Sequence, residues 1–238
     1  MSDKGRLYLI PSPLGDNDPA EVLPSSVMEL LPRLRVFVVE ELRTARRYLS
    51  RCGLKGHIEE LELHLLNEHS TPGEVEALAS LFDSGEDVGL ISEAGLPAVA
   101  DPGAQLVALC HRNGVEVVPL VGPSSLMLAL MASGLNGQSF AFCGYLPAKA
   151  DDRRRAVKEA EKRSSELRQT QIIIETPYRN DSLMSDLVQL CRPDTLICVA
   201  ADLTLPTQYI STQSAAWWRK RQGLDIGKRP CVFLILAK

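Results

Sequence analysis

The chain has 238 residues, of which 45% are hydrophobic and 24% charged, and its formal net charge is −4. This length suffices for one large core or for two cores of about 100 to 150 residues each. The negative balance argues against a protein whose whole surface coats nucleic acid, but it is compatible with a local basic face. The six cysteines are widely spaced and form no C-x-x-C pair, which is typical of reduced core residues.

Two apolar stretches bear on secretion and membrane insertion. The stretch near the N-terminus, at 7–10, is too short for the central region of a signal peptide. The stretch 117–135 carries no charge, but Pro119, Gly122 and Pro123 interrupt it. This pattern indicates a buried strand followed by a buried helix over 124–133. We therefore expect no membrane span and a cytoplasmic location.

Short apolar runs alternate with helical patterns in the first half of the chain. Strands are expected at 6–10, 34–39, 58–65, 87–91 and 115–120. Helices are expected at 21–31, 42–51, 73–84 and 102–113. The alternation predicts an α/β domain with a largely parallel sheet.

Strand patterns are more frequent in the second half. Strands are expected at 140–145, 171–175, 195–201, 207–211 and 231–237, with helices at 151–168, 180–191 and 214–221. Strands that follow one another without a helix between them favour a mixed sheet. The fold class is therefore α/β with two domains, 1–120 and 121–238, the first with a mostly parallel sheet and the second with a mixed sheet.

The segment ISEAGLPAVADPG at 91–103 is the most informative stretch of the chain. Gly95 allows a ligand to approach the backbone, and Asp101 followed by Pro102 is typical of a helix N-cap with proline at the first helical position. Open parallel sheets bind ligands beyond their strand ends. A second turn, GPSS at 122–125, follows the next strand. Two such turns at neighbouring strand ends suit a small amphiphilic cofactor.

Several common site motifs are missing. No G-x-G-x-x-G follows the first strand, GLDIGKR at 223–229 has the wrong spacing for a P-loop, and no G-x-S-x-G is present. The four histidines show neither H-E-x-x-H nor paired Cys/His ligand spacing. We therefore expect neither a dinucleotide or P-loop site nor ordinary hydrolase chemistry, and no metal.

A series of motifs runs along nearly the whole chain. They are LYLIPSPLGD at 7–16, EELRTARRYLSRCGL at 40–54, LNEHS at 66–70, LISEAGLPAVADPG at 90–103, VVPLVGPSS at 117–125, ASGL at 132–135, GYLPAK at 144–149, IIIETPYR at 172–179 and CVFLILAK at 231–238. Each motif is weak alone. In this order they resemble the tetrapyrrole methylase superfamily of S-adenosylmethionine-dependent enzymes, and within it the branch that methylates a ribose 2′-hydroxyl of bacterial small-subunit ribosomal RNA.

The resemblance implies an S-adenosylmethionine-dependent methyltransferase with the cofactor in a cleft between its two α/β domains, commonly a homodimer, with ribosomal RNA or the small ribosomal subunit as partner. Carried over by position, the cofactor-binding residues are Pro11, Ser92, Glu93, Ala94, Gly95, Leu96, Val99, Ser124, Ser125, Thr176, Pro177, Ala201 and Pro230.

The chain departs from this branch at charged positions. Glu93 stands where S-D-A-G has aspartate, and ELR at 41–43 stands where D-T-R is usual. DLTL at 202–205 replaces E-L-T-K, and KRP at 228–230 replaces K-G-E. The small-residue loops keep their pattern, so these departures concern the methyl acceptor more than the cofactor.

Methyl transfer from a sulfonium depends chiefly on holding donor and acceptor in attack geometry. A hydroxyl acceptor also needs a base for its proton, and the candidates are Glu93 and Asp101. Local roles are the alternatives: Glu93 as a solvated loop residue, and Asp101 as a helix N-cap.

Two basic clusters are candidates for contact with RNA phosphates. The residues assigned to substrate binding are Arg43, Arg46, Arg47, Lys149 and Arg153. The alternative is a solvated helix face, because acidic residues lie next to the second cluster. Two other functions stay open: methylation of a small molecule, as with corrin precursors, and a non-catalytic paralogue that binds S-adenosylmethionine or RNA.

Overall fold

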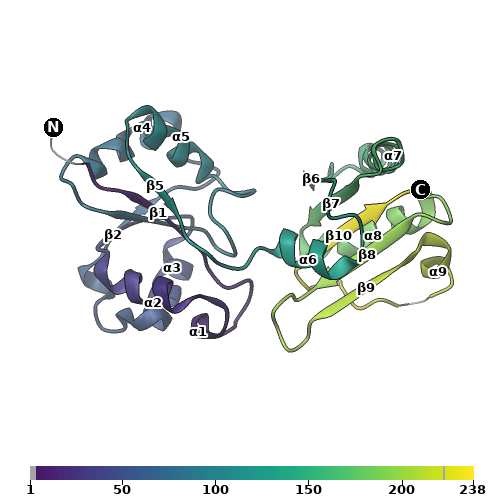
Figure 1. Cartoon of the computed structure of the whole chain (residues 1–238), viewed down its shortest axis with the longest axis horizontal. Helices are drawn as coiled ribbons and strands as arrows, with labels where there is room; N and C mark the ends of the chain where they lie inside the picture. Colours follow the sequence, from purple (N-terminus) through teal and green to yellow (C-terminus); the bar gives the residue numbers. More distant parts are fainter. Residues whose placement is uncertain (1–3, 222) are drawn as a thin grey trace. The chain divides into compact units, whose positions relative to one another are not determined.

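The computed structural model describes residues 4–221 and 223–238, shown in Figure 1. The chain divides into two compact units, Met1–Ser124 and Ser125–Lys238. This division falls shortly after the domain boundary placed at 120/121 from the sequence. Each unit has its own five-stranded sheet, and each is described by itself.

The sheet of the first unit is entirely parallel. Its strands are β1 (Leu7–Ile10), β2 (Val36–Val39), β3 (Glu62–Leu65), β4 (Val88–Ile91) and β5 (Val117–Pro119). They lie in the order β3-β2-β4-β1-β5, which confirms the predicted parallel sheet. Every side chain of β2 and β4 is buried, as expected for central strands covered on both faces. All five strands end at the same edge of the sheet.

The first unit has a hydrophobic core on each face of its sheet. Alternate residues of β1 contribute to different cores: Tyr8 and Ile10 to one and Leu7 to the other. The covering helices are α1 (Pro19–Val22), α2 (Ser25–Leu30), α3 (Leu42–Leu49), α4 (Pro72–Ala77) and α5 (Ala104–Arg112). The core that contains Tyr8 and Ile10 also contains Ala45, Tyr48 and Leu49 of α3, so α3 is fixed against the sheet.

Several expected boundaries in the first unit are wrong. The helix expected over 21–31 is broken at Pro24, which precedes α2 and has no backbone N–H to continue α1. The strand expected from 58 begins at Glu62, because Ile58–Glu60 forms a 3₁₀ turn. The helix expected from 102 begins at Ala104.

The sheet of the second unit is mixed, as predicted. Its strands are β6 (Phe140–Tyr145), β7 (Thr170–Glu175), β8 (Leu196–Ala201), β9 (Tyr209–Ser214) and β10 (Cys231–Leu236), in the order β6-β7-β10-β8-β9. Only β6 and β7 pair in parallel among these strands. The strand expected at 207–211 begins at Tyr209, because turns occupy the preceding residues, where Asp202 and Thr204 have positive φ angles.

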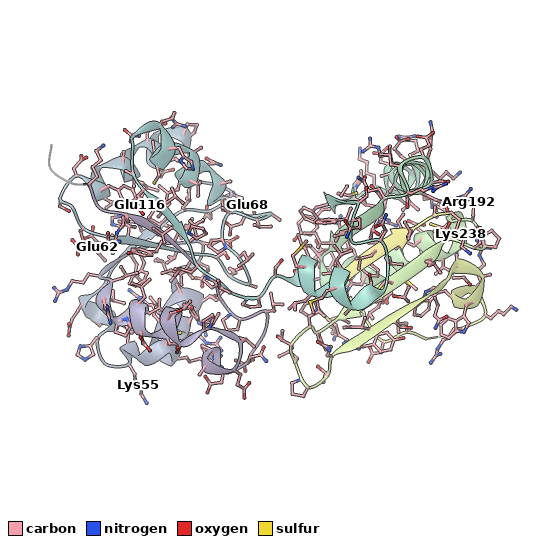
Figure 2. The ribbon with its side chains drawn as sticks, viewed as in Figure 1. Lys55, Glu62, Glu68, Glu116, Arg192 and Lys238 are labelled. Atoms are coloured by element: carbon pink, nitrogen blue, oxygen red, sulfur yellow. The ribbon has the colours of Figure 1, made fainter. Side chains whose placement is uncertain are left out.

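Four α-helices in the described part of the second unit accompany its sheet. They are α6 (Ser125–Ser133), α7 (Ala150–Leu167), α8 (Asn180–Leu190) and α9 (Ala215–Arg219). The core joins Phe233 of β10 to Val157 of α7, Leu183 of α8 and Trp218 of α9. The C-terminus is fixed nearby, because the Arg192 guanidinium donates a hydrogen bond to the carbonyl oxygen of Lys238 (Figure 2). No helix in the described part of the chain is long and apolar enough to cross a membrane.

Candidate functional site

The loop after β4 is joined to the loop after β1 at the carboxyl edge of the first sheet. The Ser12 amide donates to the Gly95 carbonyl oxygen at 2.9 Å, and the Gly95 amide donates to the Ser12 carbonyl oxygen at 3.1 Å. Gly95 has φ +77°, a conformation that glycine adopts without strain, and a Cβ there would lie 3.1 Å from a methyl carbon of Leu14. The glycine that the sequence analysis singled out in this loop therefore stands at a position where the structure requires glycine.

The turn after β5 lies beside these two loops. A Cβ on Gly122 would lie 2.2 Å from the Cβ of Pro11, and a Cβ on Gly95 would lie 3.5 Å from the Pro123 carbonyl oxygen. Because β1 lies between β4 and β5 in the sheet, the three loops leave it side by side. The structure thus brings Pro11, Gly95 and the second turn together. Ser124 and Ser125 are the last two residues of that turn, where the first unit ends and the second begins.

Asp101 holds the loop after β4 in shape. Its Oδ1 accepts hydrogen bonds from the amides of Ala98 at 3.1 Å and Gly103 at 2.6 Å. Because α5 begins at Ala104 and has Gly103 at its N-cap position, the expectation that Asp101 caps this helix is wrong. Ala98 and Ala100 have positive φ angles, and the Asp101 bonds offset the strain of this conformation.

The remaining cofactor candidates of this loop differ in exposure. Ala94 and Val99 are exposed, and Leu96 is half-buried. Ser92 is 6% exposed, and its hydroxyl has no hydrogen-bond partner among the described residues. An orphaned buried hydroxyl fits a bound ligand with polar groups.

Glu40 is a site residue that the sequence analysis missed. It follows β2 directly, and its Oε2 accepts a hydrogen bond from the Glu93 amide at 3.1 Å. Partial burial raises the pKa of the Glu40 carboxyl, and the neighbouring carboxylates of Asp101 and Glu93 raise it further, whereas the Glu93 amide lowers it. The sequence did contain a signal for this residue: Glu40 is a carboxylate directly after the buried strand β2, which lies next to β4 in the sheet.

A small polar hollow lies beside Glu40. Its volume is about 10 Å³, room for one water-sized group. The lining residues come from the ends of β1, β2 and β4 and from α3; they are Ser12, Glu40, Glu41, Thr44, Ala45, Tyr48, Ile91, Ser92 and Glu93. The Tyr48 hydroxyl donates to the Pro11 carbonyl oxygen at 2.7 Å, which fixes α3 to the loop after β1.

Glu41, which replaces the family's usual aspartate, has a local role. It caps α3, because its Oε2 accepts hydrogen bonds from the Thr44 amide at 2.5 Å and the Thr44 hydroxyl at 2.9 Å. The Arg43 amide, followed by the amide and hydroxyl of Thr44, lowers the pKa of the Glu41 carboxyl. The helix that carries the first basic cluster therefore begins at a fixed point beside the hollow.

The two basic clusters differ in accessibility. Arg43, Arg46 and Arg47 are exposed on α3 at spacings that place them on one helix face, and none forms an ion pair with a described residue. Arg153 of α7 is 7% exposed, with its Nε 2.7 Å from Oδ2 of Asp186 on α8. This burial argues against the expected phosphate contact of Arg153, because Asp186 already pairs with its guanidinium. Lys149 is exposed.

The second-unit candidates lie at one end of their sheet. Cys231 is paired in register with Glu175 on one side and Ala201 on the other, so Thr176, Ala201 and Pro230 lie close together. The Asp202 amide donates to the Pro230 carbonyl oxygen at 3.0 Å, which continues the pairing. Pro177 follows Thr176 and is exposed.

Two of the departures from the family pattern form a pair with each other. The Arg229 Nε lies 2.8 Å from Oδ2 of Asp202, and the Thr207 hydroxyl donates to the same oxygen at 2.8 Å. Asp202, which replaces the family's usual glutamate, therefore forms an ion pair with Arg229, which replaces its usual glycine. Across the described residues, no group of three or more His, Cys, Asp or Glu side chains is arranged to hold a metal ion.

The architecture is that of methyltransferases of known structure. The crystal structure of the methyltransferase CobJ superposes with a TM-score of 0.65, over 98% of this chain and 94% of that one, at 17% identity. Uroporphyrin-III C-methyltransferase from Thermus thermophilus, in complex with S-adenyl homocysteine, gives a TM-score of 0.57, over 98% of this chain and 97% of that one, at 18% identity. These likenesses establish the fold class.

The family follows from the sequence match. Residues 7–216 match the model of the Tetrapyrrole (Corrin/Porphyrin) Methylases. The chain therefore belongs to the tetrapyrrole methylase family, as its motifs imply.

Several relatives carry one name, Ribosomal RNA small subunit methyltransferase I. The protein from Escherichia coli O157:H7 is 31% identical over 205 residues, which are 85% of this chain and 67% of the relative. The protein from Vibrio cholerae serotype O1 is 31% identical over 83% of this chain and 65% of its own length. The protein from Xylella fastidiosa is 29% identical over 100% of this chain and 83% of its own length. The chain thus spans about two thirds of the length of the first two relatives.

Proposed function

We propose that the chain transfers a methyl group from S-adenosylmethionine to a ribose 2′-hydroxyl of small-subunit ribosomal RNA. The observation that carries this proposal is the 31% identity, over 85% of the chain, to a relative named Ribosomal RNA small subunit methyltransferase I. The geometry supports it, because the glycine turns at 95 and 122 lie together at the carboxyl edge of the parallel sheet.

The cofactor supplies a methyl group already activated on a sulfonium, so the protein's main task is orientation. In the first unit, the backbone at Gly95 and Leu96, the ring of Pro11 and the residues after Gly122 would hold it. Neither glycine position can carry a side chain without strain or displacement of a neighbour, so both glycines are needed to keep these loops packed together. The contacts expected from Thr176, Pro177, Ala201 and Pro230 stay predictions.

The acceptor brings a charged phosphate backbone to a protein of net negative charge. The exposed face of α3 is a local exception, because Arg43, Arg46 and Arg47 project from it without ion-pair partners among the described residues. Such a face binds phosphates and orients the strand without reading its sequence. We assign the phosphate contact to this face, with Lys149 as a second contact.

Transfer of labelled methyl to isolated ribosomal subunits tests the proposed function. Small subunits from a strain that lacks its own enzyme would serve as acceptor, with large subunits as the matched control. We expect label in the small-subunit RNA at a ribose that resists alkaline cleavage. Label in a tetrapyrrole precursor instead would establish the small-molecule alternative, and cofactor binding without transfer to either acceptor would establish a non-catalytic paralogue.

We also propose that the protein works in the cytoplasm as a homodimer. Relatives named for ribosomal RNA support the location. An apolar stripe on the edge strand β6 supports the dimer, because Phe140, Phe142 and Tyr145 are 41%, 38% and 56% exposed. Light scattering should give twice the chain mass for the wild type and a lower mass for Phe142→Ser; a monomeric wild type at micromolar concentration would refute the dimer.

A further inference from the structure

The polar hollow beside α3 has features that its carboxylates alone do not explain. It has room for one oxygen-sized group, and its walls come from the ends of three neighbouring strands. Ser92, which is 6% exposed, contributes to the wall, and its hydroxyl has no hydrogen-bond partner in the part of the chain that the structure describes. A buried hydroxyl without a hydrogen bond costs free energy, and an incoming oxygen group would supply the missing partner.

Four carboxylates lie in or near this hollow, and their surroundings differ. Glu41 is engaged in capping α3. The Glu93 side chain is exposed, and only its backbone amide makes a described hydrogen bond. Asp101 is occupied with the loop, because one of its oxygens accepts two backbone amides. Glu40 is half-buried in the wall of the hollow, where its Oε2 accepts the Glu93 amide and its carboxyl also interacts with the side chain of Asp101. Of the four, Glu40 is the carboxylate that is both half-buried in the wall and not engaged in a cap or a loop, so it is the one placed to accept a proton inside the hollow.

We propose that Glu40 accepts the proton of the methyl-acceptor hydroxyl, and that this hydroxyl occupies the hollow, where its oxygen accepts a hydrogen bond from Ser92 Oγ. The inference rests on the proposed function and identifies the general base of that reaction. The hydroxyl proton passes to the Glu40 carboxylate while the oxygen forms its bond to the methyl carbon and the sulfur keeps the electron pair of the broken bond. Charge is conserved: a carboxylate and a sulfonium give a carboxylic acid and a thioether.

The electrostatics of the hollow agree with this role. Burial and the nearby charges of Asp101 and Glu93 raise the pKa of Glu40, which makes its carboxylate a stronger base. The other titratable groups in the wall are Glu41 and Tyr48, both from the α3 side. The Arg43 amide and the capping bonds from Thr44 lower the pKa of Glu41. Burial raises the pKa of Tyr48, which stays protonated and donates to the Pro11 carbonyl oxygen.

The first experiment measures turnover and cofactor affinity in matched variants. Glu40→Gln keeps an oxygen for the Glu93 amide but removes the base, so we expect kcat to fall about 100-fold or more, with the S-adenosylmethionine affinity from calorimetry within about twofold of wild type. Ser92→Ala should lower kcat about tenfold. The control is Glu59→Gln, an exposed glutamate of the first unit outside the hollow, for which we expect kcat within about threefold of wild type. A wild-type kcat in Glu40→Gln, or a larger loss in Glu93→Gln than in Glu40→Gln, would overturn the proposal.

The second experiment needs no substrate. In protein labelled with ¹³C at the glutamate carboxyl carbons, the Glu40 resonance is the one that Glu40→Gln removes. We expect this resonance to titrate above the exposed glutamates and to move to lower pH in Asp101→Asn, which removes a neighbouring negative charge. Titration of Glu40 with the exposed glutamates would overturn the proposal. Wild-type protein that methylates no ribosomal subunit would refute the proposed function instead. The titration would still show whether the pKa of the Glu40 carboxyl is raised.

Discussion

The two units place polar side chains in different ways. In the first unit, parallel strands all end at one edge, and the glycine turns, Glu40 and the loop held by Asp101 gather there. In the second unit, antiparallel pairing brings Ala201 and Pro230 together, and several nearby charges are paired with each other, as in Asp202 with Arg229. Strand ends in the first unit therefore leave polar groups available, whereas those in the second unit use charge to stabilise the fold. The number of charged residues in a segment does not distinguish these two uses.

The largest expected effect is on stability, and it comes from breaking the buried ion pair of the second unit. Arg153→Met should lower the free energy of unfolding by about 3 kcal/mol, because Asp186 is left buried with only the half-exposed Arg154 as a partner. Chemical denaturation of the purified variant measures this change.

Two control variants accompany it. Arg155→Met removes an exposed arginine from the same helix and should cost less than about 0.5 kcal/mol. A double variant, Arg153→Met with Asp186→Leu, should recover most of the lost stability, since no charge is then buried alone. Equal stability of Arg153→Met and Arg155→Met would contradict the division between structural and available arginines.

The next effect concerns the glycine turn of the first unit. Gly95→Leu should weaken S-adenosylmethionine binding about 100-fold or more, because the new side chain has no free space beside Leu14 and Pro123 and must displace the loop that would hold the cofactor. Calorimetry provides the affinity, and circular dichroism checks that the fold is kept.

Gly114→Leu is the matched control for this variant. Gly114 also has a positive φ, +67°, but a Cβ there would meet nothing within 4 Å. Both substitutions strain the backbone by about 1–2 kcal/mol. They differ in that the new side chain meets neighbouring atoms at position 95 and none at position 114. Full affinity in Gly95→Leu would place the cofactor elsewhere.

A smaller effect tests the accessible arginines. Replacing Arg43, Arg46 and Arg47 by alanine should reduce the slope of log affinity against log salt by about 2, as expected for three lost phosphate contacts. The same charge change at Arg33, Arg35 and Lys55, which are also exposed, should leave the slope nearly unchanged. Filter binding to small subunits over a salt series distinguishes the two variants. Equal slopes in both would show that α3 has no special role.

The smallest effect is a pH dependence of stability at Glu40. A carboxyl whose pKa is raised in the folded state binds more protons there than in the unfolded state, so stability falls as pH rises through the window above the ordinary glutamate pKa. Relative to Glu40→Gln, the wild type should therefore lose less than about 1 kcal/mol between about pH 5 and pH 8. Urea denaturation at both pH values measures the difference, and a relative gain for the wild type would mean that Glu40 is stabilised as a carboxylate.

Hydrophobic periodicity was enough to predict the parallel and mixed sheets, because burial on one or two faces fixes where apolar residues recur. The loops at 95 and 122 were also found, since glycine and proline mark backbone that must turn or be approached closely. Local patterns failed where a tertiary partner decides. Asp101 had the pattern of an N-cap but closes a loop, and Arg153 had the pattern of a surface cation but pairs with Asp186, 33 residues away. Glu40 was missed because its partner, the Glu93 amide, comes from another strand end.

Calorimetric titration of the whole chain with S-adenosylmethionine tests the central claim most directly. We expect saturable binding at one site per chain, with S-adenosylhomocysteine competing for it. A folded protein that binds neither compound would contradict the assignment of the strand-end loops to a cofactor and, with it, the proposed methyl transfer.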